Sequence, residues 1–306
     1  MEINLDYQMN LYGLNKNFDE LKTLYKNNKL PCQILLSGQK GSGKSTLAYH
    51  FINFILSENE DYPYDLDKHE INGENRSYKL IKNNVHPNFN LIDIKDNKKT
   101  IDINQVRNLI QNLNKSSFNE KPRFVLIDNL EYLNLNSINA LLKILEEPPE
   151  NTHFILINSD KKILPTLKSR CLNFKISLSN KVSYEIIKYI FKDDLLNILD
   201  ESFLYYYSTP GKIYRLINFA NQNNIDLKKN NLKNFLSIII DDGHYKKDVM
   251  LTIILNDLIE YFLIKNISKN SFDFFSYFLK KIENIKKYNL DEESFFMEFK
   301  TKLLDG

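Results

Sequence analysis

The clearest chemical pattern in the chain is GQKGSGKS at positions 38–45, which has the glycine, lysine and serine spacing of a phosphate-binding loop. The loop directly follows an apolar run and opens an amphipathic stretch, which is the context such a loop requires. Its backbone N–H groups can surround phosphate oxygens, Lys44 can reach the β- and γ-phosphates, and Ser45 can bind Mg²⁺. The alternative is a glycine-rich turn with a solvated lysine. The context favours a nucleotide-binding site.

A second candidate for chemistry is Asp128, the last residue of the apolar run RFVLID at 123–128. A carboxylate at the end of a strand can hold magnesium through water, although a helix N-cap or loop aspartate would look the same. In an ATPase built on such a loop, a glutamate that activates water normally follows. Here the next residue is Asn129, which can orient water but cannot accept its proton. Glu131 is interpreted as a solvated helix residue rather than a displaced base, so we expect slow or absent hydrolysis.

The elements that would position these residues are apolar runs separated by amphipathic stretches, the pattern of an α/β fold with a parallel sheet. The predicted strands are QILLSG (33–38), FNLIDI (89–94), RFVLID (123–128), HFILIN (153–158) and LNFKI (172–176). Their nearly continuous hydrophobicity is typical of strands buried on both faces.

Two helices are predicted between these strands. Apolar residues at helical spacing form one face in each, namely Leu47, Phe51, Phe54 and Ile55 in the first, and Val106, Leu109, Ile110 and Leu113 in the second. Asp102 and Gln105 have the spacing of a capping box at the start of the second. Residues 58–86 are polar and lack a clear period, and we interpret them as an insertion.

After residue 178 the strand pattern fades and apolar residues recur at helical spacing, with Pro210-Gly211 as the strong breaker. We therefore predict three domains: a nucleotide-binding domain at 1–177, a small helical domain at 178–220 and a larger helical domain at 221–306.

The composition restricts the function classes. With 41 basic and 39 acidic residues, the net charge is +2, so no global basic field predicts a strong autonomous nucleic-acid binder. Cys32 and Cys171 are too few for a disulfide framework or a four-cysteine zinc site, and we expect both to be reduced and packed. No apolar run is long enough to cross a bilayer, and the first residues lack signal-peptide features, so a cytoplasmic location without membrane contact is expected.

A third stretch, SINALLKILEEPPENTHFILINSDKKILPTLKSRCLNF at 137–174, closely resembles clamp-loader subunits of the AAA+ class. Further upstream, HPNFNLIDI, IDINQVRNL and the loop helix KSTLAYHF are most similar to the delta-prime group of bacterial DNA polymerase III, in the zinc-free form of many alphaproteobacteria. The resemblance covers about residues 30–220. It implies a RecA-like AAA+ parallel sheet domain, a small helical lid and an all-α C-terminal collar domain that assembles with other subunits.

The resemblance also implies site residues. Asp128 becomes the magnesium-site acid together with Ser45, Asn158 becomes the first sensor, and Arg170 becomes an arginine finger that acts in trans on a neighbour's ATP site. Without the resemblance, Asn158 would be read as a turn residue and Arg170 as a surface arginine beside Cys171. The nucleotide-binding loop comprises Gly38, Gln39, Lys40, Gly41, Ser42, Gly43, Lys44, Ser45 and Thr46.

Two departures from active loaders support weak hydrolysis. Asn129 replaces the glutamate, and Gly211 in the turn Ser208-Thr209-Pro210-Gly211-Lys212 replaces the second-sensor arginine. The zinc module of many relatives is also absent, with residues 58–86 in its place. The implied ligand is ATP or ADP with Mg²⁺, without zinc.

The implied function is that of a subunit of a DNA-directed DNA polymerase holoenzyme, a nucleotidyltransferase, with little or no ATPase activity of its own. The implied partners are the tau/gamma and delta subunits in a ring, the sliding clamp, and primed DNA through the complex. The alternatives are an ATP-hydrolysing motor subunit of the same loader, a P-loop kinase for a small molecule, or an independent nucleic-acid-binding module. The kinase leaves LEEPP and SRC unexplained, and the charge balance disfavours the last.

Overall fold

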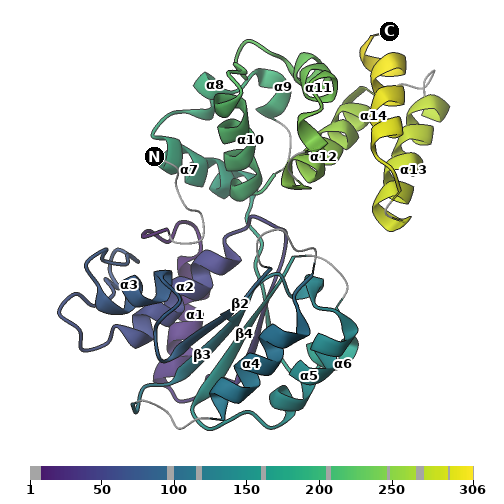
Figure 1. Cartoon of the computed structure of the whole chain (residues 1–306). Helices are drawn as coiled ribbons and strands as arrows, with labels where there is room; N and C mark the ends of the chain where they lie inside the picture. Colours follow the sequence, from purple (N-terminus) through teal and green to yellow (C-terminus); the bar gives the residue numbers. More distant parts are fainter. Residues whose placement is uncertain are drawn as a thin grey trace. The chain divides into compact units, whose positions relative to one another are not determined.

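The computed structural model describes residues 8–94, 100–114, 119–159, 163–204, 208–246, 249–266, 272–288 and 290–305. The chain divides into two compact units, Met1–Ser179 and Asn180–Gly306, shown in Figure 1. The border between them lies two residues from the end of the predicted nucleotide-binding domain. The second predicted border, at residue 220, falls inside helix α10 (Pro210–Gln222). The division of the helical part into lid and collar therefore stays a prediction.

The first unit is built on a five-stranded parallel sheet with the order β2-β3-β4-β1-β5 (Figure 1). Its strands are β1 (Gln33–Ser37), β2 (Phe89–Ile92), β3 (Arg123–Ile127), β4 (Thr152–Asn158) and β5 (Leu172–Lys175). All five predicted strands are confirmed, and most of them end one or two residues earlier than the apolar runs suggest. Gly38 and Asp128 consequently lie just beyond their strands, in the loops at the carboxyl edge of the sheet.

Helices cover both faces of this sheet, with α1, α2 and α3 on one side and α4, α5 and α6 on the other (Figure 1). Their bounds are α1 (Asn15–Lys26), α2 (Lys44–Leu56), α3 (Arg76–Lys82), α4 (Ile103–Leu113), α5 (Leu135–Glu146) and α6 (Pro165–Lys168). A short 3₁₀ helix (Leu130–Tyr132) follows β3. This layering explains the continuous hydrophobicity of the three central strands, β1, β3 and β4, because helices cover both of their faces. The edge strand β5 instead exposes three of its four residues.

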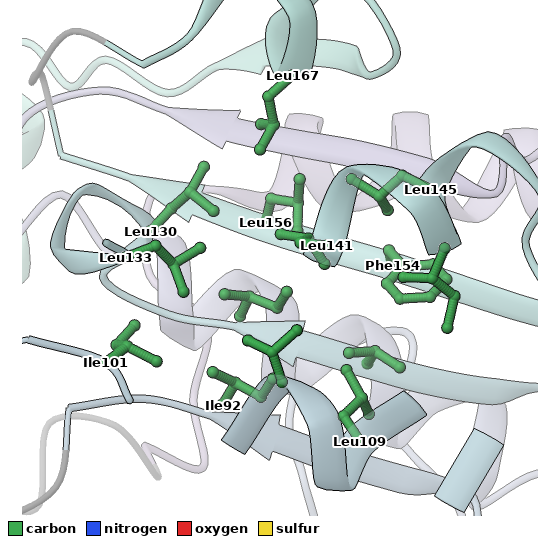
Figure 2. Packing of buried hydrophobic residues seen from close by; sticks show 14 of the residues in the cluster. Ile92, Ile101, Leu109, Leu130, Leu133, Leu141, Leu145, Phe154, Leu156 and Leu167 are labelled. Atoms are coloured by element: carbon green, nitrogen blue, oxygen red, sulfur yellow. The ribbon is translucent and has the colours of Figure 1, made fainter. Parts of the chain in front are cut away.

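The core between the sheet and α4 and α5 is shown in Figure 2. Leu109 of α4 and Leu141 and Leu145 of α5 pack there with Phe154 and Leu156 of β4. The predicted inner face of the second helix is confirmed. Its Val106, Leu109 and Leu113 are buried, and Ile110 packs at the border of the cluster. Asp102 caps the helix as predicted, but its side chain accepts a hydrogen bond from the Asn104 backbone N–H rather than from Gln105. The Gln105 Nε2 has no hydrogen-bond partner among the described residues, and the Gln105 half of the predicted capping box is not observed.

Helix α2, which follows the phosphate-binding loop, differs from the amphipathic helix expected there. Leu47, Phe51 and Ile55 are buried as predicted, but so are His50 and Asn53 on other sides of the helix. The Phe51 ring packs against Phe124 of β3 with a centroid distance of 6.3 Å. Helix α2 is thus enclosed, because the sheet covers one side and the following segment covers others.

That enclosing segment is the predicted insertion at 58–86, which contains helix α3. Asn75 caps α3 by accepting a hydrogen bond from the Tyr78 backbone N–H, and it also accepts one from the Asn53 side chain of α2 at 3.0 Å. The Ser77 hydroxyl lies 3.1 Å from the carbonyl oxygen of Leu56, the last residue of α2, to which it can donate a hydrogen bond. The insertion is therefore joined to α2 by buried polar groups, which a hydrophobic period does not reveal.

The second unit is helical throughout the residues that the structure describes. It contains α7 (Asn180–Phe191), α8 (Leu195–Ile198), α9 (Glu201–Leu204), α10 (Pro210–Gln222), α11 (Leu232–Asp241), α12 (Val249–Asn266), α13 (Phe272–Tyr288) and α14 (Glu293–Phe299), with a 3₁₀ helix at His244–Lys246 and a π-helical turn at Lys300–Leu304. Lys212 of α10 forms an ion pair with Asp257 of α12 at 2.6 Å. No helix of the described residues is long and apolar enough to cross a membrane.

One cysteine expectation is wrong. Both thiols are free, but Cys32 is exposed rather than packed, because it lies in the loop before β1. Cys171 is half-buried, and burial raises the pKa of its thiol to about 11.

Candidate nucleotide-binding site

The predicted loop connects β1 to α2 and depends on glycine for its backbone path. Gly38, Gly41 and Gly43 have φ angles of 146°, 83° and 83°, values that residues with a side chain rarely adopt. A Cβ atom at Gly38 would lie 2.1 Å from the carbonyl oxygen of Ile176. The loop therefore approaches the end of β5 more closely than any other residue type permits, and it directs the N-terminus of the 13-residue α2 towards the carboxyl edge of the sheet.

Lys44 is buried within this loop. Its Nζ donates hydrogen bonds to the carbonyl oxygens of Gly38 at 2.8 Å and Gln39 at 2.7 Å. A lysine cation at this position remains inside the loop, where it can exchange a carbonyl oxygen for a phosphate oxygen. The side chain is not solvated, so the alternative reading of a solvated lysine in a glycine turn is wrong.

Ser45 and Asp128 lie together although they are far apart in the sequence. The Ser45 hydroxyl donates to Asp128 Oδ2 at 2.5 Å, joining the first turn of α2 to the residue after β3. A hydroxyl and a carboxylate side by side are the oxygen ligands expected at a magnesium site next to a phosphate loop. The residues present fit the predicted Mg²⁺–nucleotide group.

The remaining loop residues surround these groups. Gln39 is exposed, Ser42 is buried and donates its backbone N–H to Gln39 O at 3.3 Å, and Thr46 is half-buried in α2. The Lys40 Nζ lies 5.9 Å from the centroid of the Tyr132 ring, within the range of a cation–π contact. The loop therefore exposes few side chains and presents mainly backbone.

Asn158, the predicted first sensor, is the last residue of β4 and is buried. In the sheet register it pairs with Ser37, the last residue of β1, so it lies beside the start of the phosphate-binding loop. The structure thus brings Asn158 to the loop, as the prediction requires. Its sensing role stays a prediction.

Asn129 occupies the position of the missing glutamate in an unusual backbone conformation. Its φ angle is 54°, in the left-handed region that asparagine tolerates better than most residues. Its backbone N–H donates to Asp128 Oδ1 at 2.7 Å, and its side-chain amide donates to Asp93 Oδ1 at 2.7 Å. Asn129 therefore links two carboxylates, one of which follows β2. The side-chain amide can donate to Asp93, whereas a glutamate here would have no donor for it and would add a third negative charge.

Glu131 is not a solvated helix residue as predicted. It lies half-buried in the 3₁₀ helix after β3, and its carboxylate accepts a hydrogen bond from the Ser159 backbone N–H at 3.3 Å. This contact ties the loop after β3 to the end of β4, beside Asn158.

Arg170 lies apart from the phosphate-binding loop, in the segment between α6 and β5. Its guanidinium donates from Nη1 to the Thr166 carbonyl oxygen at 2.6 Å and from Nη2 to Glu146 Oε1 at 2.5 Å. The side chain is 34% exposed. Arg170 is thus held at the surface of its own unit, where it is accessible to another molecule.

Two buried histidines, His50 and His86, form hydrogen bonds inside the first unit. In α2, the ring of His50 contacts the Tyr64 hydroxyl at 2.9 Å and the Gln8 carbonyl at 3.0 Å, and burial lowers its pKa to about 4. Burial also lowers the pKa of His86 to about 4. Both rings are neutral near pH 7, so they act as hydrogen-bonding core residues. Among the residues that the structure describes, no cluster of three His, Cys, Asp or Glu side chains could hold a metal ion.

A groove of about 750 Å³ also lies between α4 and α5, on the outer side of their packed faces. Its lining combines Ile103, Ile110 and Ile144 with the cations Arg107 and Lys143. None of the predicted site residues lines it, so it is separate from the nucleotide site.

Comparison with known proteins shows the family to which the chain belongs. The family described as DNA polymerase III, delta subunit, matches residues 13–180, a range that includes the phosphate-binding loop, Asp128, Asn158 and Arg170. The chain belongs to this family. The predicted fold class, a RecA-like AAA+ sheet domain followed by helices, agrees with the family and with the parallel sheet, and is confirmed.

The delta-family chain also resembles individual proteins. DNA polymerase III subunit delta' of Buchnera aphidicola subsp. Baizongia pistaciae is 29% identical, over 92% of this chain and 95% of the relative. DNA polymerase III subunit gamma of Buchnera aphidicola subsp. Schizaphis graminum is 32% identical over 55% of this chain, a match that spans 44% of the relative. A gamma subunit-related protein of Thermotoga maritima, at 18% identity, aligns over 92% of this chain and 97% of that chain with a TM-score of 0.49. The resemblance to delta-prime subunits is confirmed; the zinc-free alphaproteobacterial type stays a prediction.

Sequence reasoning missed two residues of this delta-family site, Asp93 and Glu146. Asp93 follows a predicted strand, and parallel strands end at one edge of a sheet, so its position could have been suspected. That β2 lies beside β3 was not visible. Glu146 was read as part of the LEEPP motif, but nothing in the sequence linked it to Arg170.

Proposed function

We propose that the chain is a delta-prime-type subunit of the clamp loader of the replicative DNA polymerase. In this proposal it assembles with tau/gamma and delta subunits in a ring, completes a neighbour's ATP site through Arg170, and helps load the sliding clamp on primed DNA. The family membership and the relatives named delta' and gamma support it. The observation that carries the trans-acting role is the contrast between Asn129, which cannot act as a base, and Arg170, which is held at the surface.

The proposal includes nucleotide held by the chain itself. Backbone N–H groups of the loop and of the first turn of α2 would bind the phosphates of ATP or ADP, together with Lys44. Ser45 and Asp128 would hold Mg²⁺, and Asn158 would contact the terminal phosphate region. With Asn129 bound to Asp93, no side chain at the expected position can take a proton from water, so the pocket retains nucleotide rather than turning it over.

In the second unit, we propose that α7–α10 form the lid and α11–α14 the collar that carries the assembly contacts. The ion pair between Lys212 and Asp257 joins these parts in the free chain.

The deciding experiment is ATPase and clamp loading by the reconstituted complex with Arg170→Ala. A guanidinium that stabilises charge on a neighbour's γ-phosphate is worth roughly 10³- to 10⁵-fold at a single site, a loss that several sites in a ring would dilute. We expect lower turnover with normal assembly. Lys168→Ala, which removes an exposed cation two residues away, is the matched control. Normal clamp loading by assembled Arg170→Ala complexes would refute the finger.

The motor-subunit alternative is favoured by the intact loop, with Lys44 buried and Ser45 bound to Asp128. It predicts rapid ATP turnover by the isolated chain that Lys44→Ala abolishes. Our proposal instead predicts that Lys44→Ala weakens nucleotide binding to the isolated chain and leaves turnover of the complex largely intact. Equilibrium binding of ATP and single-subunit ATPase assays separate the two.

A further inference from the structure

Two motifs that are separate in the sequence meet at the surface of the first unit. Glu146 is the last residue of α5, and Arg170 lies 24 positions later, after α6. Their side chains form an ion pair, with Nη2 of Arg170 at 2.5 Å from Oε1 of Glu146. The end of α5 and the loop after α6 are thereby connected through the proposed finger.

The guanidinium has a second anchor. Its Nη1 donates to the Thr166 carbonyl oxygen at 2.6 Å, so both Nη atoms are fixed, one by a side chain and one by the backbone. An arginine has five N–H groups. The other three, on Nε and on the two Nη atoms, have no hydrogen-bond partner among the residues that the structure describes.

We propose that Glu146 is a positioning residue for Arg170. A long, flexible side chain loses rotamer freedom when it binds a ligand, and a partner that already fixes it reduces this loss. Glu146 holds Nη2 of the guanidinium and the Thr166 carbonyl holds Nη1, so three N–H donors remain for an oxyanion on another molecule. This inference rests on the proposed role of Arg170 in trans.

The exposure of the Glu146–Arg170 ion pair predicts that it contributes little to folding stability. The Glu146 side chain is 52% exposed and that of Arg170 is 34% exposed, so water screens their attraction. Removing the carboxylate should therefore have little effect on folding. Its effect should appear in the turnover of the complex that Arg170 serves, because preorganisation matters when the guanidinium meets developing charge.

The test uses the reconstituted clamp loader with Glu146→Ala, Glu146→Gln and Arg170→Ala, and the double variant of Glu146→Ala with Arg170→Ala. Glu147→Ala is the control, because it removes the neighbouring exposed carboxylate, which forms no ion pair with the described residues. ATPase is measured as kcat and as KM for ATP, and assembly and thermal unfolding are followed in parallel.

We expect Glu146→Ala to lower kcat roughly three- to tenfold with unchanged KM, assembly and unfolding temperature. Glu146→Gln, which keeps an acceptor oxygen, should lose less, and Glu147→Ala should match the wild type. The double variant should equal Arg170→Ala alone, because Glu146 acts through the guanidinium. Unchanged or faster turnover in Glu146→Ala, an equal loss in Glu147→Ala, or additive losses in the double variant would overturn the positioning role while leaving the finger intact. A wild-type rate with Arg170→Ala would overturn both.

Discussion

At the residue scale, the candidate nucleotide site has groups that can bind phosphate and magnesium, but an asparagine stands where a general base is expected. Lys44, Ser45 and Asp128 form the arrangement expected for phosphate and magnesium. Asn129 replaces a base, and its amide is bound to Asp93. The Asp93 carboxylate beside the position of the missing glutamate comes from the end of another strand and already accepts a hydrogen bond. This explains why an intact loop need not imply an active ATPase.

The hydrogen bond between Asn129 and Asp93 predicts that the single substitution Asn129→Glu does not restore ATPase activity. Asn129→Glu would place a carboxylate against Asp93 in a backbone conformation that costs a glutamate about 1 to 2 kcal/mol more than it costs glycine. We expect this variant to be less stable and to gain no ATPase activity. Combining it with Asp93→Asn restores a donor for the new carboxylate, and we expect turnover of the isolated chain to rise at least tenfold, since a general base contributes about 10²- to 10⁴-fold.

The measurement is single-subunit ATPase, with Lys44→Ala added to each variant as background and Asp93→Asn alone as the control. Full activity from Asn129→Glu by itself would show that Asp93 does not restrain this position.

At the element scale, two close contacts determine how α2 and its loop are held. The loop passes over the end of β5 at Gly38. The insertion encloses α2 through the contact of Tyr64 with His50 and the hydrogen bond between Asn75 and Asn53. Neither contact involves the chemistry of the site directly. Both fix the position of the helix whose N-terminus would face the phosphates.

Gly38→Ala should therefore destabilise the first unit. The added methyl group would overlap the Ile176 carbonyl oxygen, which belongs to the backbone and cannot rotate away, and the φ angle of 146° is unfavourable for alanine. We expect a loss of about 2 to 4 kcal/mol in the free energy of unfolding. Gly73→Ala is the matched control, because its Cβ would lie 3.4 Å from the Met9 side chain, an ordinary contact. Equal urea midpoints for the two variants would contradict the close approach.

The buried His50 predicts a pH dependence of stability. Its pKa is lowered from 6.5 to about 4 in the folded chain, so the folded state holds the ring neutral while the unfolded state binds a proton below about pH 6.5. Stability from this group is complete above pH 6.5 and is lost as the pH falls towards 4. The full effect is on the order of 3 kcal/mol.

Urea unfolding followed by circular dichroism between pH 4 and 7.5 measures this dependence. His86 and His153, whose pKa values are also lowered by burial, add to the decline, so the informative comparison is with His50→Gln. That variant should be less stable at pH 7 and should show a slope smaller by up to one proton. An unchanged slope would mean that His50 is already accessible to water.

At the scale of the whole molecule, the two units have different tasks in the proposed function. In that proposal the first unit would hold nucleotide and carry the finger Arg170, and the described residues of the second unit offer exposed apolar side chains. Helices α13 and α14 both carry exposed apolar side chains. Phe274 and Tyr277 lie one turn apart in α13, Met297 lies in α14, and the Tyr277 hydroxyl donates to Glu298 of α14 at 3.2 Å.

These three residues predict the assembly contact of the collar. Replacing Phe274, Tyr277 and Met297 by serine removes exposed apolar area, which contributes to association when a partner buries it. We expect at least a tenfold weaker association with the other loader subunits, measured by analytical ultracentrifugation, with the fold preserved by circular dichroism. Tyr189→Ser, which changes a 66% exposed tyrosine of α7, is the control. Wild-type assembly of the triple variant would place the contact elsewhere in the second unit.

The sequence by itself determined the local features. The loop GQKGSGKS, the five strands and the inner face of α4 follow from spacing and period, because each depends on residues within about a dozen positions. The position of Ser45 beside Asp128 was predicted only because a known loop family has that arrangement.

Only the tertiary structure decided the contacts between distant segments. Asp93 contacts Asn129 because β2 lies next to β3 in the sheet. Glu146 contacts Arg170 because the C-terminal end of α5 lies beside the segment after α6. Helix α2 is enclosed because polar side chains of the insertion bond to it. Sheet order and hydrogen bonds between distant polar groups leave no period in the sequence, so these partners become visible only when the chain is folded.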